Sequence, residues 1–225
     1  MELKILSGGA MQGLIAEAVP LFERDGGCKV TVEIGLTSAV RKAIADGAAF
    51  DIALLPRPDI DALARDGRIA AGGVTDIARS AIGVAVRAGA PKPDISTVDA
   101  FKCAVLQAGS VTYSDGPSGL YIAGLMDRLG LAEAIKSKAK LTTGPVAELL
   151  ARGEAELGLQ QIVAILPVKG AELVGPLPSE LQNIIVYAAG LSSTAANGAA
   201  AQSFIDFMTA PEVARIIRAK GLEPG

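Results

Sequence analysis

The sequence predicts an α/β protein of two Rossmann-like lobes joined by two crossover segments, with a ligand cleft between the lobes. Short apolar strands alternate with helical patterns over the first third, which is typical of a parallel sheet with right-handed crossovers. A second alternation begins near residue 98, and extended segments near 79–88 and 182–191 separate the two regions. We therefore expect lobe 1 to comprise residues 1–80 plus 191–225 and lobe 2 residues 82–189, hinged at the extended segments. A single doubly wound sheet is the alternative.

The elements of the first lobe follow from apolar periodicity. Residues 3–6 form a short strand, and Leu14, Ala18 and Leu21 recur at helical spacing, which predicts a helix over 10–23 after a turn at 7–9. Over 29–34, valine and isoleucine alternate with polar residues, as in a half-buried strand. The remaining elements are a helix from about 37 to 46, a strand at 51–55, a helix at 59–66, and C-terminal helices at 195–208 and 211–220.

The second lobe begins with an extended stretch, because no helical pattern separates 73–76 from 81–87. Its expected elements are helices at 98–107, 120–129 and 146–152, strands at 111–113 and 156–159, an apolar segment at 162–166 and an extended run at 181–190.

The composition excludes several kinds of chemistry. The chain contains 0 histidines, with Lys+Arg 21 against Asp+Glu 24. This excludes a Ser–His–Asp or Cys–His catalytic pair, a histidine-ligated metal and an imidazole pH switch. A P-loop and a G-x-S-x-G nucleophile elbow are also absent from the sequence. The net charge of −3, without a basic run, argues against a nucleic-acid partner. We expect no metal and no cofactor.

Two cysteines, Cys28 and Cys103, lie far apart in the chain and lack the spacing of a metal site. We expect both to be buried structural thiols; a disulfide would need their Cα atoms within about 7 Å and stays open. No run of about 18 apolar residues occurs, so no membrane insertion is expected. The predicted location is periplasmic if a signal peptide was trimmed and cytoplasmic if Met1 is the native start.

Four junctions between a strand and the next helix are rich in glycine, serine, threonine or proline. They are residues 7–10, 35–38, 114–119 and 142–146. In open α/β sheets, ligands bind beyond the carboxyl ends of the strands, where the backbone N–H groups of helix N-termini hold anions. Thr37, Ser38 and Ser118 would add hydroxyl donors. The competing interpretation is ordinary helix capping by serine and threonine.

Arg57 directly follows the third predicted strand and lies between two prolines. A guanidinium held rigidly at the carboxyl end of a strand suits bidentate recognition of a carboxylate. The alternative is a solvated arginine in a loop. Arg57 is therefore a candidate for binding an anionic ligand.

In combination, these features resemble the molybdate-binding proteins of ABC importers, within the type 2 periplasmic-binding-protein superfamily. The similar segments follow one another in the order and spacing of that family: residues 6–11, 36–38 with 45–52, 117–121, 155–158, and 204–208 with 211–214. The resemblance implies two lobes, two crossover strands, a ligand in the cleft between the lobes, and an ABC importer membrane component as partner.

The ligand residues of that family carry over only in part. There the anion is bound by a serine in the first turn, a serine opening the second helix, backbone groups of later helix starts, and a tyrosine after a late strand. The first serine falls on Ala10 here, and the tyrosine falls on Gln160 or Gln161. The expected ligand-binding residues, Arg57 included, are Gly8, Gly9, Ala10, Thr37, Ser38, Arg57, Ser118, Gly119, Val146, Gln160 and Gln161.

A tetrahedral oxyanion would lack two side-chain donors in such a site, and an unpaired buried charge is costly. The two glutamines, Arg57 and the small first turn better suit a small organic acid. The sequence therefore predicts a solute-binding protein that closes on a small anionic ligand.

Two other functions stay open. One is an isomerase on the same scaffold, acting on a tricarboxylate such as aconitate, in which proton transfer would fall to Asp115, Tyr113, a glutamate or a lysine. The other is an effector-binding domain like that of a LysR-type regulator, which would need a partner chain to bind DNA.

Overall fold

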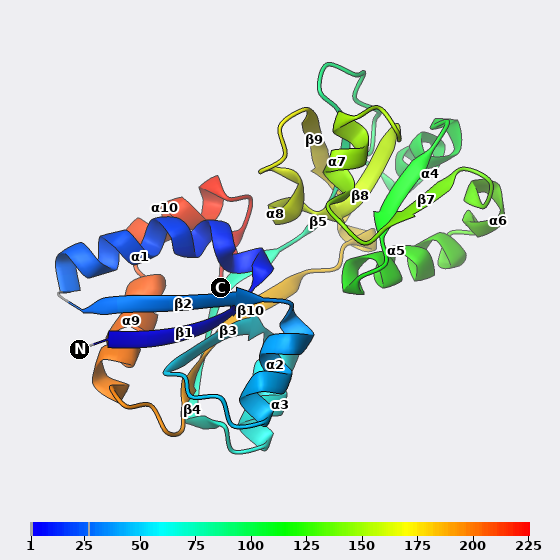
Figure 1. The fold of residues 1–225 in the computed structure, drawn as a ribbon. Coiled ribbons are helices and arrows are strands. Elements are labelled where there is room, and N and C mark those ends of the chain that lie inside the picture. Colours follow the sequence, from blue (N-terminus) through cyan, green and yellow to red (C-terminus); the bar gives the residue numbers. More distant parts are fainter. Residues whose placement is uncertain (1, 27) are drawn as a thin grey trace. The chain divides into compact units, whose positions relative to one another are not determined.

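The computed structural model describes residues 2–26 and 28–225, which form two compact units. Lobe 1 runs to Arg79 and resumes at Ile185–Gly225, and lobe 2 is Ser80–Ile184 (Figure 1). The mixed α/β class with two sheets agrees with the prediction. Both boundaries differ slightly from the expected ones. Ser80 is expected in lobe 1 but opens the second unit, and residues 185–189 are expected in lobe 2 but belong to a strand of the lobe 1 sheet.

The lobe 1 sheet has six strands in the order β11-β4-β10-β3-β1-β2. Its strands are β1 (Glu2–Gly8), β2 (Lys29–Gly35), β3 (Ile52–Pro56), β4 (Ile69–Ser80), β10 (Ile185–Ser192) and β11 (Glu223–Pro224). β1 pairs in parallel with both β2 and β3, whereas β10 runs antiparallel to β3. The parallel strands of lobe 1 therefore share one carboxyl edge, as the predicted alternation requires.

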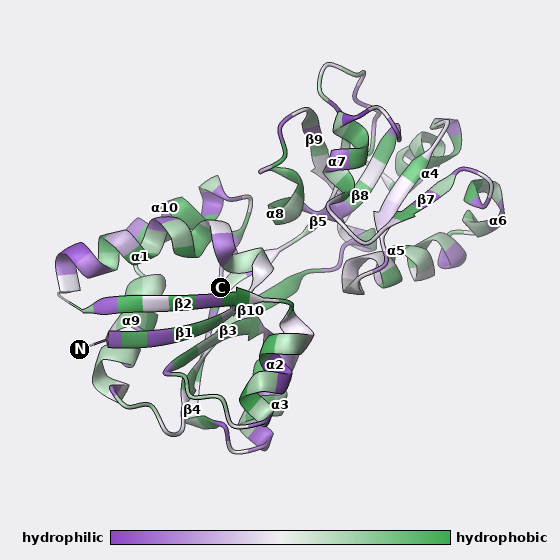
Figure 2. Cartoon of the chain, viewed as in Figure 1, coloured by the Kyte–Doolittle hydropathy of each residue, from purple (hydrophilic) through white to green (hydrophobic). Residues whose placement is uncertain are grey.

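Helices cover both faces of this sheet. They are α1 (Gln12–Gly26), α2 (Thr37–Ala45), α3 (Arg57–Arg65), α9 (Gly198–Met208) and α10 (Pro211–Ala219). Ala53 and Leu55 of β3 pack in one core with α2 and α3, and the alternate residues Ile52 and Leu54 are fully buried as well. Because successive side chains of a strand point to opposite faces, β3 is covered on both sides. Figure 2 shows the corresponding concentration of hydrophobic residues on β3 and β10.

Three helices of lobe 1 begin at residues other than those expected, and one of them, α9, starts at Gly198 and not at residue 195. A short 3-10 turn, η1 (Gly9–Met11), precedes α1, so the regular helix starts at Gln12 and not at residue 10. α3 starts at Arg57 and not at residue 59. Pro56 and Pro58, which flank Arg57, are compatible with this start, because the missing N–H of a proline would have no partner in the first turn of a helix.

Asp51 ties the C-terminal part of lobe 1 to its sheet. Its buried carboxylate accepts hydrogen bonds from the backbone N–H of Lys4 (2.9 Å) and of Ala196 (3.0 Å). Its carbonyl oxygen accepts from the N–H of Ser192 at 2.9 Å. These bonds hold the chain leaving β10 against the start of β3.

The lobe 2 sheet has five strands in the order β7-β6-β8-β5-β9. They are β5 (Ile82–Arg87), β6 (Val111–Ser114), β7 (Ala139–Thr142), β8 (Leu157–Gln161) and β9 (Ala171–Pro176). β6 is parallel to β7 and to β8, and β5 is antiparallel to β8 and β9. β7 and β9 were not predicted. Neither strand contains a buried residue, so no face of it requires regularly spaced apolar side chains and the sequence shows no apolar alternation there.

The helices of lobe 2 are α4 (Val98–Gln107), α5 (Pro117–Arg128), α6 (Ala132–Ile135), α7 (Val146–Ala151) and α8 (Ile162–Ile165), with a 3-10 turn η2 (Ser179–Leu181). The apolar segment 162–166 is thus a single helical turn. Phe101, Ile122 and Leu125 share a core with strand residues that include Val84 and Leu159. A smaller core joins α7 and α8 to β5.

The side chain of Gln182 joins the two segments that had been expected as hinges, on the lobe 2 side. Its Oε1 accepts from the N–H of Ile82 at 2.7 Å, and its Nε2 donates to the carbonyl oxygen of the same residue at 3.0 Å. The Tyr121 hydroxyl donates to the carbonyl oxygen of Leu181 at 3.0 Å. The start of β5 and the end of lobe 2 are therefore held together by side chains.

The cysteines differ in environment. Cys28 is buried at the edge of β2, as expected, but Cys103 is an exposed free thiol on α4. The expectation that Cys103 is buried was wrong, because the buried face of α4 is formed by Phe101, Ala104 and Val105. Across the described ranges, no helix is long and apolar enough to span a membrane.

Candidate functional site

In lobe 1, the ends of three parallel strands bring the candidate residues together. β1, β2 and β3 end at Gly8, Gly35 and Pro56, so the segments that follow lie at one edge of the sheet. A Cβ atom on Gly8 would lie 3.0 Å from Oγ1 of Thr37, which shows that this hydroxyl is packed directly over the first turn. Gly9 and Ala10 form η1 beside it.

The hydroxyls of Thr37 and Ser38 lie inside the first turn of α2 and do not cap it. The N-cap is Leu36, and no side chain makes a capping hydrogen bond there. The N-caps of α5 and α7, Gly116 and Pro145, make no such bond either, although the first N–H of α7, on Val146, donates to the Gln160 side chain. Since α4 in the same protein is capped by a threonine hydroxyl, the capping interpretation does not explain these junctions. They leave backbone N–H groups available at positive helix ends.

Ser7 was not predicted as a site residue, although it directly precedes Gly8. It is fully buried, and its Oγ donates to the carbonyl oxygen of Gly8 at 3.1 Å. A serine in an otherwise apolar strand, next to two glycines, was the available signal. It orients the backbone of the first turn and has no exposed surface of its own.

Arg57 opens α3, where the sequence placed it, but its charge is balanced within lobe 1. Nε donates to Asp61 at 2.8 Å and Nη1 to Asp76 at 2.6 Å. The hydrogen bonds to Asp61 and then to Asp76 raise the pKa of the guanidinium above its ordinary value. Arg57 is thus neither a solvated loop arginine nor an unpartnered cation.

In lobe 2, the ends of β6 and β8 position a second group. Ser118 and Gly119, in the first turn of α5, are both buried. The Ser118 hydroxyl lies 3.5 Å from that of Ser114, at the end of β6. A Cβ atom on Gly119 would lie 1.5 Å from the carbonyl oxygen of Ser114, so only glycine allows this approach of helix and strand. Ser114 was not predicted individually as a site residue.

Val146 and Gln160 form one unit. The side-chain Oε1 of Gln160, on β8, accepts a hydrogen bond from the backbone N–H of Val146 at 2.9 Å. One of the N–H groups at the start of α7 is therefore already satisfied, and this bond uses the acceptor oxygen of Gln160 and neither of the two donors on its Nε2. Gln161 is the last residue of β8 and is half-buried.

The structure thus gathers the predicted residues into two sets, one at the carboxyl edge of each sheet. The set in lobe 1 is Gly8, Gly9, Ala10, Thr37, Ser38 and Arg57, and the set in lobe 2 is Ser118, Gly119, Val146, Gln160 and Gln161. Apart from the paired Arg57, both sets offer neutral N–H and O–H donors, which suit an anion bound without a formal counter-charge.

Large apolar side chains lie exposed beside these donors. Leu36, the residue before Thr37, is 78% exposed, and Leu120, the residue after Gly119, is 70% exposed. Ile34 at the end of β2 and Leu141 near the end of β7 are also exposed. Each edge therefore combines hydrogen-bond donors with apolar surface.

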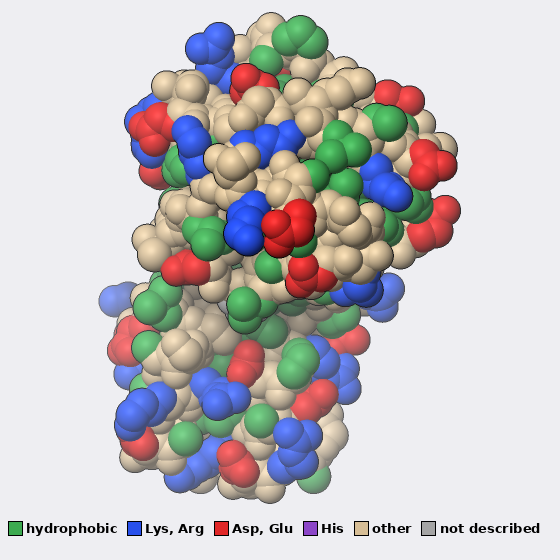
Figure 3. All heavy atoms as spheres, turned by 90° about the vertical axis from the view of Figure 1, so that its right-hand side faces the viewer, with side chains coloured by type: hydrophobic (Ala, Val, Ile, Leu, Met, Phe, Trp, Pro, Cys, Tyr) green, Lys and Arg blue, Asp and Glu red, His purple; other side chains and the backbone are tan. Residues whose placement is uncertain are grey.

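Charged residues do not form a site of another kind in the part of the chain that the structure describes. No group of three or more histidine, cysteine, aspartate and glutamate residues there could hold a metal ion. On the face drawn in Figure 3, acidic and basic side chains are interspersed and form no continuous basic surface.

Comparison with known proteins gives one family. The family model described as bacterial extracellular solute-binding protein matches residues 3–223. A curated protein of Pseudomonas sp., named aconitate isomerase, is 34% identical over 229 residues, which cover 99% of this chain and 87% of that protein.

Solved structures agree in fold. A substrate binding domain assigned to a molybdenum ABC transporter of Clostridium difficile has a TM-score of 0.84 at 16% identity, with 100% of this chain and 99% of that chain covered. The periplasmic molybdate-binding protein of Azotobacter vinelandii has a TM-score of 0.77 at 20% identity, with 99% of each chain covered. At these identities the likeness establishes the type 2 periplasmic-binding-protein fold.

Proposed function

Since the chain belongs to the bacterial extracellular solute-binding protein family, we propose that it binds a small organic acid through neutral donors at the carboxyl edges of its sheets. The observation that carries this proposal is that the N-cap residues of α2 and α5 make no side-chain capping hydrogen bond, at helix starts where the family resemblance implies ligand contacts. The N-terminus of a helix stabilises a nearby negative charge by about 0.3–1 kcal/mol at an exposed position.

The first turn of lobe 1 supports an organic acid over a bare oxyanion. Ala10 supplies no hydroxyl, and the Gln160 amide is partly used by Val146. A compact tetrahedral ion would therefore keep few side-chain donors. Leu36 and Leu120 provide apolar surface next to the donors, where the carbon skeleton of an organic acid would be covered.

Arg57 has a secondary place in the proposal. Its Nε and Nη1 atoms are engaged by Asp61 and Asp76, so a ligand carboxylate would compete with two carboxylates for the guanidinium. We expect the Arg57→Gln variant to weaken binding less than the loss of a neutral donor does.

Calorimetric titration with molybdate, sulfate, citrate and aconitate tests the ligand class. We expect a tricarboxylate or dicarboxylate to bind and the inorganic oxyanions to bind weakly. Thr37→Val and Ser118→Ala should each weaken binding about ten-fold, the loss expected for one hydrogen bond to a charged group. Ser179→Ala, at an exposed serine of lobe 2, is the matched control. Tight molybdate binding with no binding of organic acids would refute the proposal.

A second candidate function is favoured by the relative in Pseudomonas, whose printed name is aconitate isomerase. The present chain would then move a proton on a tricarboxylate without histidine. Asp115, which is exposed and three residues before Ser118 in the chain, is our first candidate for this step, whereas Tyr113 is half-buried on β6. Exchange of carbon-bound hydrogen in heavy water, followed by NMR, tests this function, and an Asp115→Asn variant should abolish such exchange. Lack of exchange in any bound acid would exclude it.

The family also suggests where the protein acts. We propose that it is periplasmic and delivers its ligand to the membrane component of an ABC importer. Copurification with an ABC importer membrane component from its native cell would support this; retention of the protein in the cytoplasm of that cell would contradict it.

A further inference from the structure

Lobe 2 contains a cavity of about 430 Å³ at the end of its sheet opposite to the donor set. It is lined by Glu156 and Leu157 at the start of β8 and by Val86 and Arg87 at the end of β5, which runs antiparallel to β8. The end of α4 completes the wall. The cavity is therefore separated from Gln160 and Gln161 by the full length of β8. Its size lies within the range of small-molecule sites.

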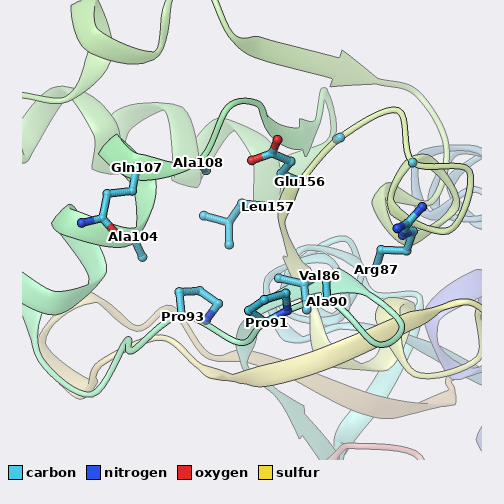
Figure 4. A pocket seen from close by; sticks show the side chains of 12 residues that line it. Val86, Arg87, Ala90, Pro91, Pro93, Ala104, Gln107, Ala108, Glu156 and Leu157 are labelled. Carbon is cyan, nitrogen blue, oxygen red and sulfur yellow. The ribbon is translucent and has the colours of Figure 1, made fainter.

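Most of the lining is apolar. Leu157 lies in the middle of the cavity in Figure 4, with Pro91 and Pro93 on one side and the end of α4 on another. Ala104 and Ala155 leave the space open, because larger residues at these positions would fill it. Two prolines make this wall rigid, so little ordering is required when an apolar group enters.

Two side chains of opposite charge, Arg87 and Glu156, line different sides of the cavity (Figure 4). The Arg87 guanidinium lies along the backbone of Gly153, since a Cβ there would be 3.4 Å from Nη1. The Glu156 carboxylate is fixed on the other side, because its Oε2 accepts from the N–H of Gly109 at 2.7 Å. Within residues 2–26 and 28–225, neither Arg87 nor Glu156 forms an ion pair.

This pattern contrasts with that of nearby charged groups. Lys92 pairs with Glu172 at 3.6 Å, and Arg152 pairs with Glu154 at 2.6 Å. Arg87 and Glu156, in contrast, line the cavity and form no ion pair with another described residue. A ligand with one charge of each sign would complement both, and a dianion would be repelled by Glu156.

We propose that this cavity binds a small zwitterion with an apolar body, of the size of an apolar dipeptide. Its carboxylate is bound by Arg87, its ammonium group by Glu156, and its apolar body covers Leu157. A dipeptide fits better than a single amino acid, because its two charges are separated by a peptide unit and can reach different walls. The site is independent of the anion-binding function proposed above.

Titration of leucyl-leucine into the ¹⁵N-labelled full chain, followed by NMR, tests the inference. We expect saturable shifts of the Gly109 and Gly153 amides, with the Gly119 amide unaffected. N-acetyl-leucyl-leucine lacks the ammonium group, and leucyl-leucine amide lacks the carboxylate. Each should bind about ten-fold more weakly than the dipeptide, as for the loss of one charge-assisted contact.

Variants then assign each charge. Arg87→Gln should weaken binding of the dipeptide about ten-fold and leave binding of leucyl-leucine amide unchanged. Glu156→Gln should also weaken binding of the dipeptide about ten-fold, and it should leave binding of N-acetyl-leucyl-leucine unchanged. Both replacements are nearly isosteric, and the glutamine at 156 can still accept from Gly109. Ala108→Phe, which fills the cavity from its rim, should abolish binding, and Arg128→Gln is the matched control. The absence of shifts at Gly109 and Gly153 would overturn the proposal, and so would charge variants that bind the dipeptide as tightly as the parent protein does.

Discussion

Replacing Gly119 by alanine places a methyl group where the structure has no room for one. The new Cβ would lie 1.5 Å from the carbonyl oxygen of Ser114 and 2.5 Å from its carbonyl carbon, which is backbone at the end of β6. Real Cβ atoms do not approach other heavy atoms closer than 3.0 Å, so α5 must shift away from β6. Overpacking of this kind costs about 3 kcal/mol when the backbone has to move.

Two other glycines near this turn provide matched controls. A Cβ on Gly116 would lie 3.7 Å from Oγ of Ser114, and a Cβ on Gly124, within α5, would lie 3.7 Å from Nη1 of Arg128. Gly116→Ala should therefore be nearly neutral, and Gly124→Ala should stabilise by about 0.5–1 kcal/mol through helix propensity.

Urea unfolding followed by circular dichroism measures all three variants. Gly119→Ala should lower the free energy of unfolding by about 3 kcal/mol, the melting temperature by roughly 10 °C, and ligand affinity with them. If the free energy of unfolding of Gly119→Ala lies within about 0.5 kcal/mol of that of the parent protein, α5 and β6 do not approach each other as closely as described, and Gly119 does not have the place in the site given above.

Other predictions concern stability. The Lys138 ammonium donates to three carbonyl oxygens at the end of α4, so Lys138→Met should destabilise by about 1–2 kcal/mol, whereas Lys136→Met, at an exposed ion pair, should be neutral in the same urea assay. Asp51→Asn replaces one acceptor by a donor facing a backbone N–H, and should cost about 2 kcal/mol; an unchanged unfolding midpoint would show that these N–H groups find other partners. Hydrogen bonds from Arg24 and Arg152 lower the pKa values of Asp25 and Glu154 below the ordinary 3.8 and 4.5. The small contribution of these carboxylates to the stability of the fold is therefore complete above the ordinary values and is lost as the pH falls through the folded pKa. With 0 histidines, melting temperature and ligand affinity should stay flat between about pH 6 and 8, and a protein group titrating near pH 6.5 would contradict this.

Local patterns in the sequence were sufficient for much of the fold. The alternation along β2 and the helical spacing in α1 come from side chains of which one set faces the core, so their period is visible in the chain. β3 is buried on both faces and is visible as an unbroken apolar run. β7 and β9 could not be found in this way, because their residues are only partly buried and their pairing depends on distant neighbours.

The candidate site shows the same division. Glycine, serine and threonine at the strand ends determined which segments hold the donors, since backbone N–H groups at a helix start follow from local structure.

Only the tertiary structure decided how those residues are used. The two carboxylates on Arg57, the Gln160 amide on Val146 and the contact of Gly119 with Ser114 each join atoms from different elements. A sequence states which groups are present and the local conformation they favour. Their partners depend on strand order and on the packing of helices against the sheet, and these are set by the burial of the whole core.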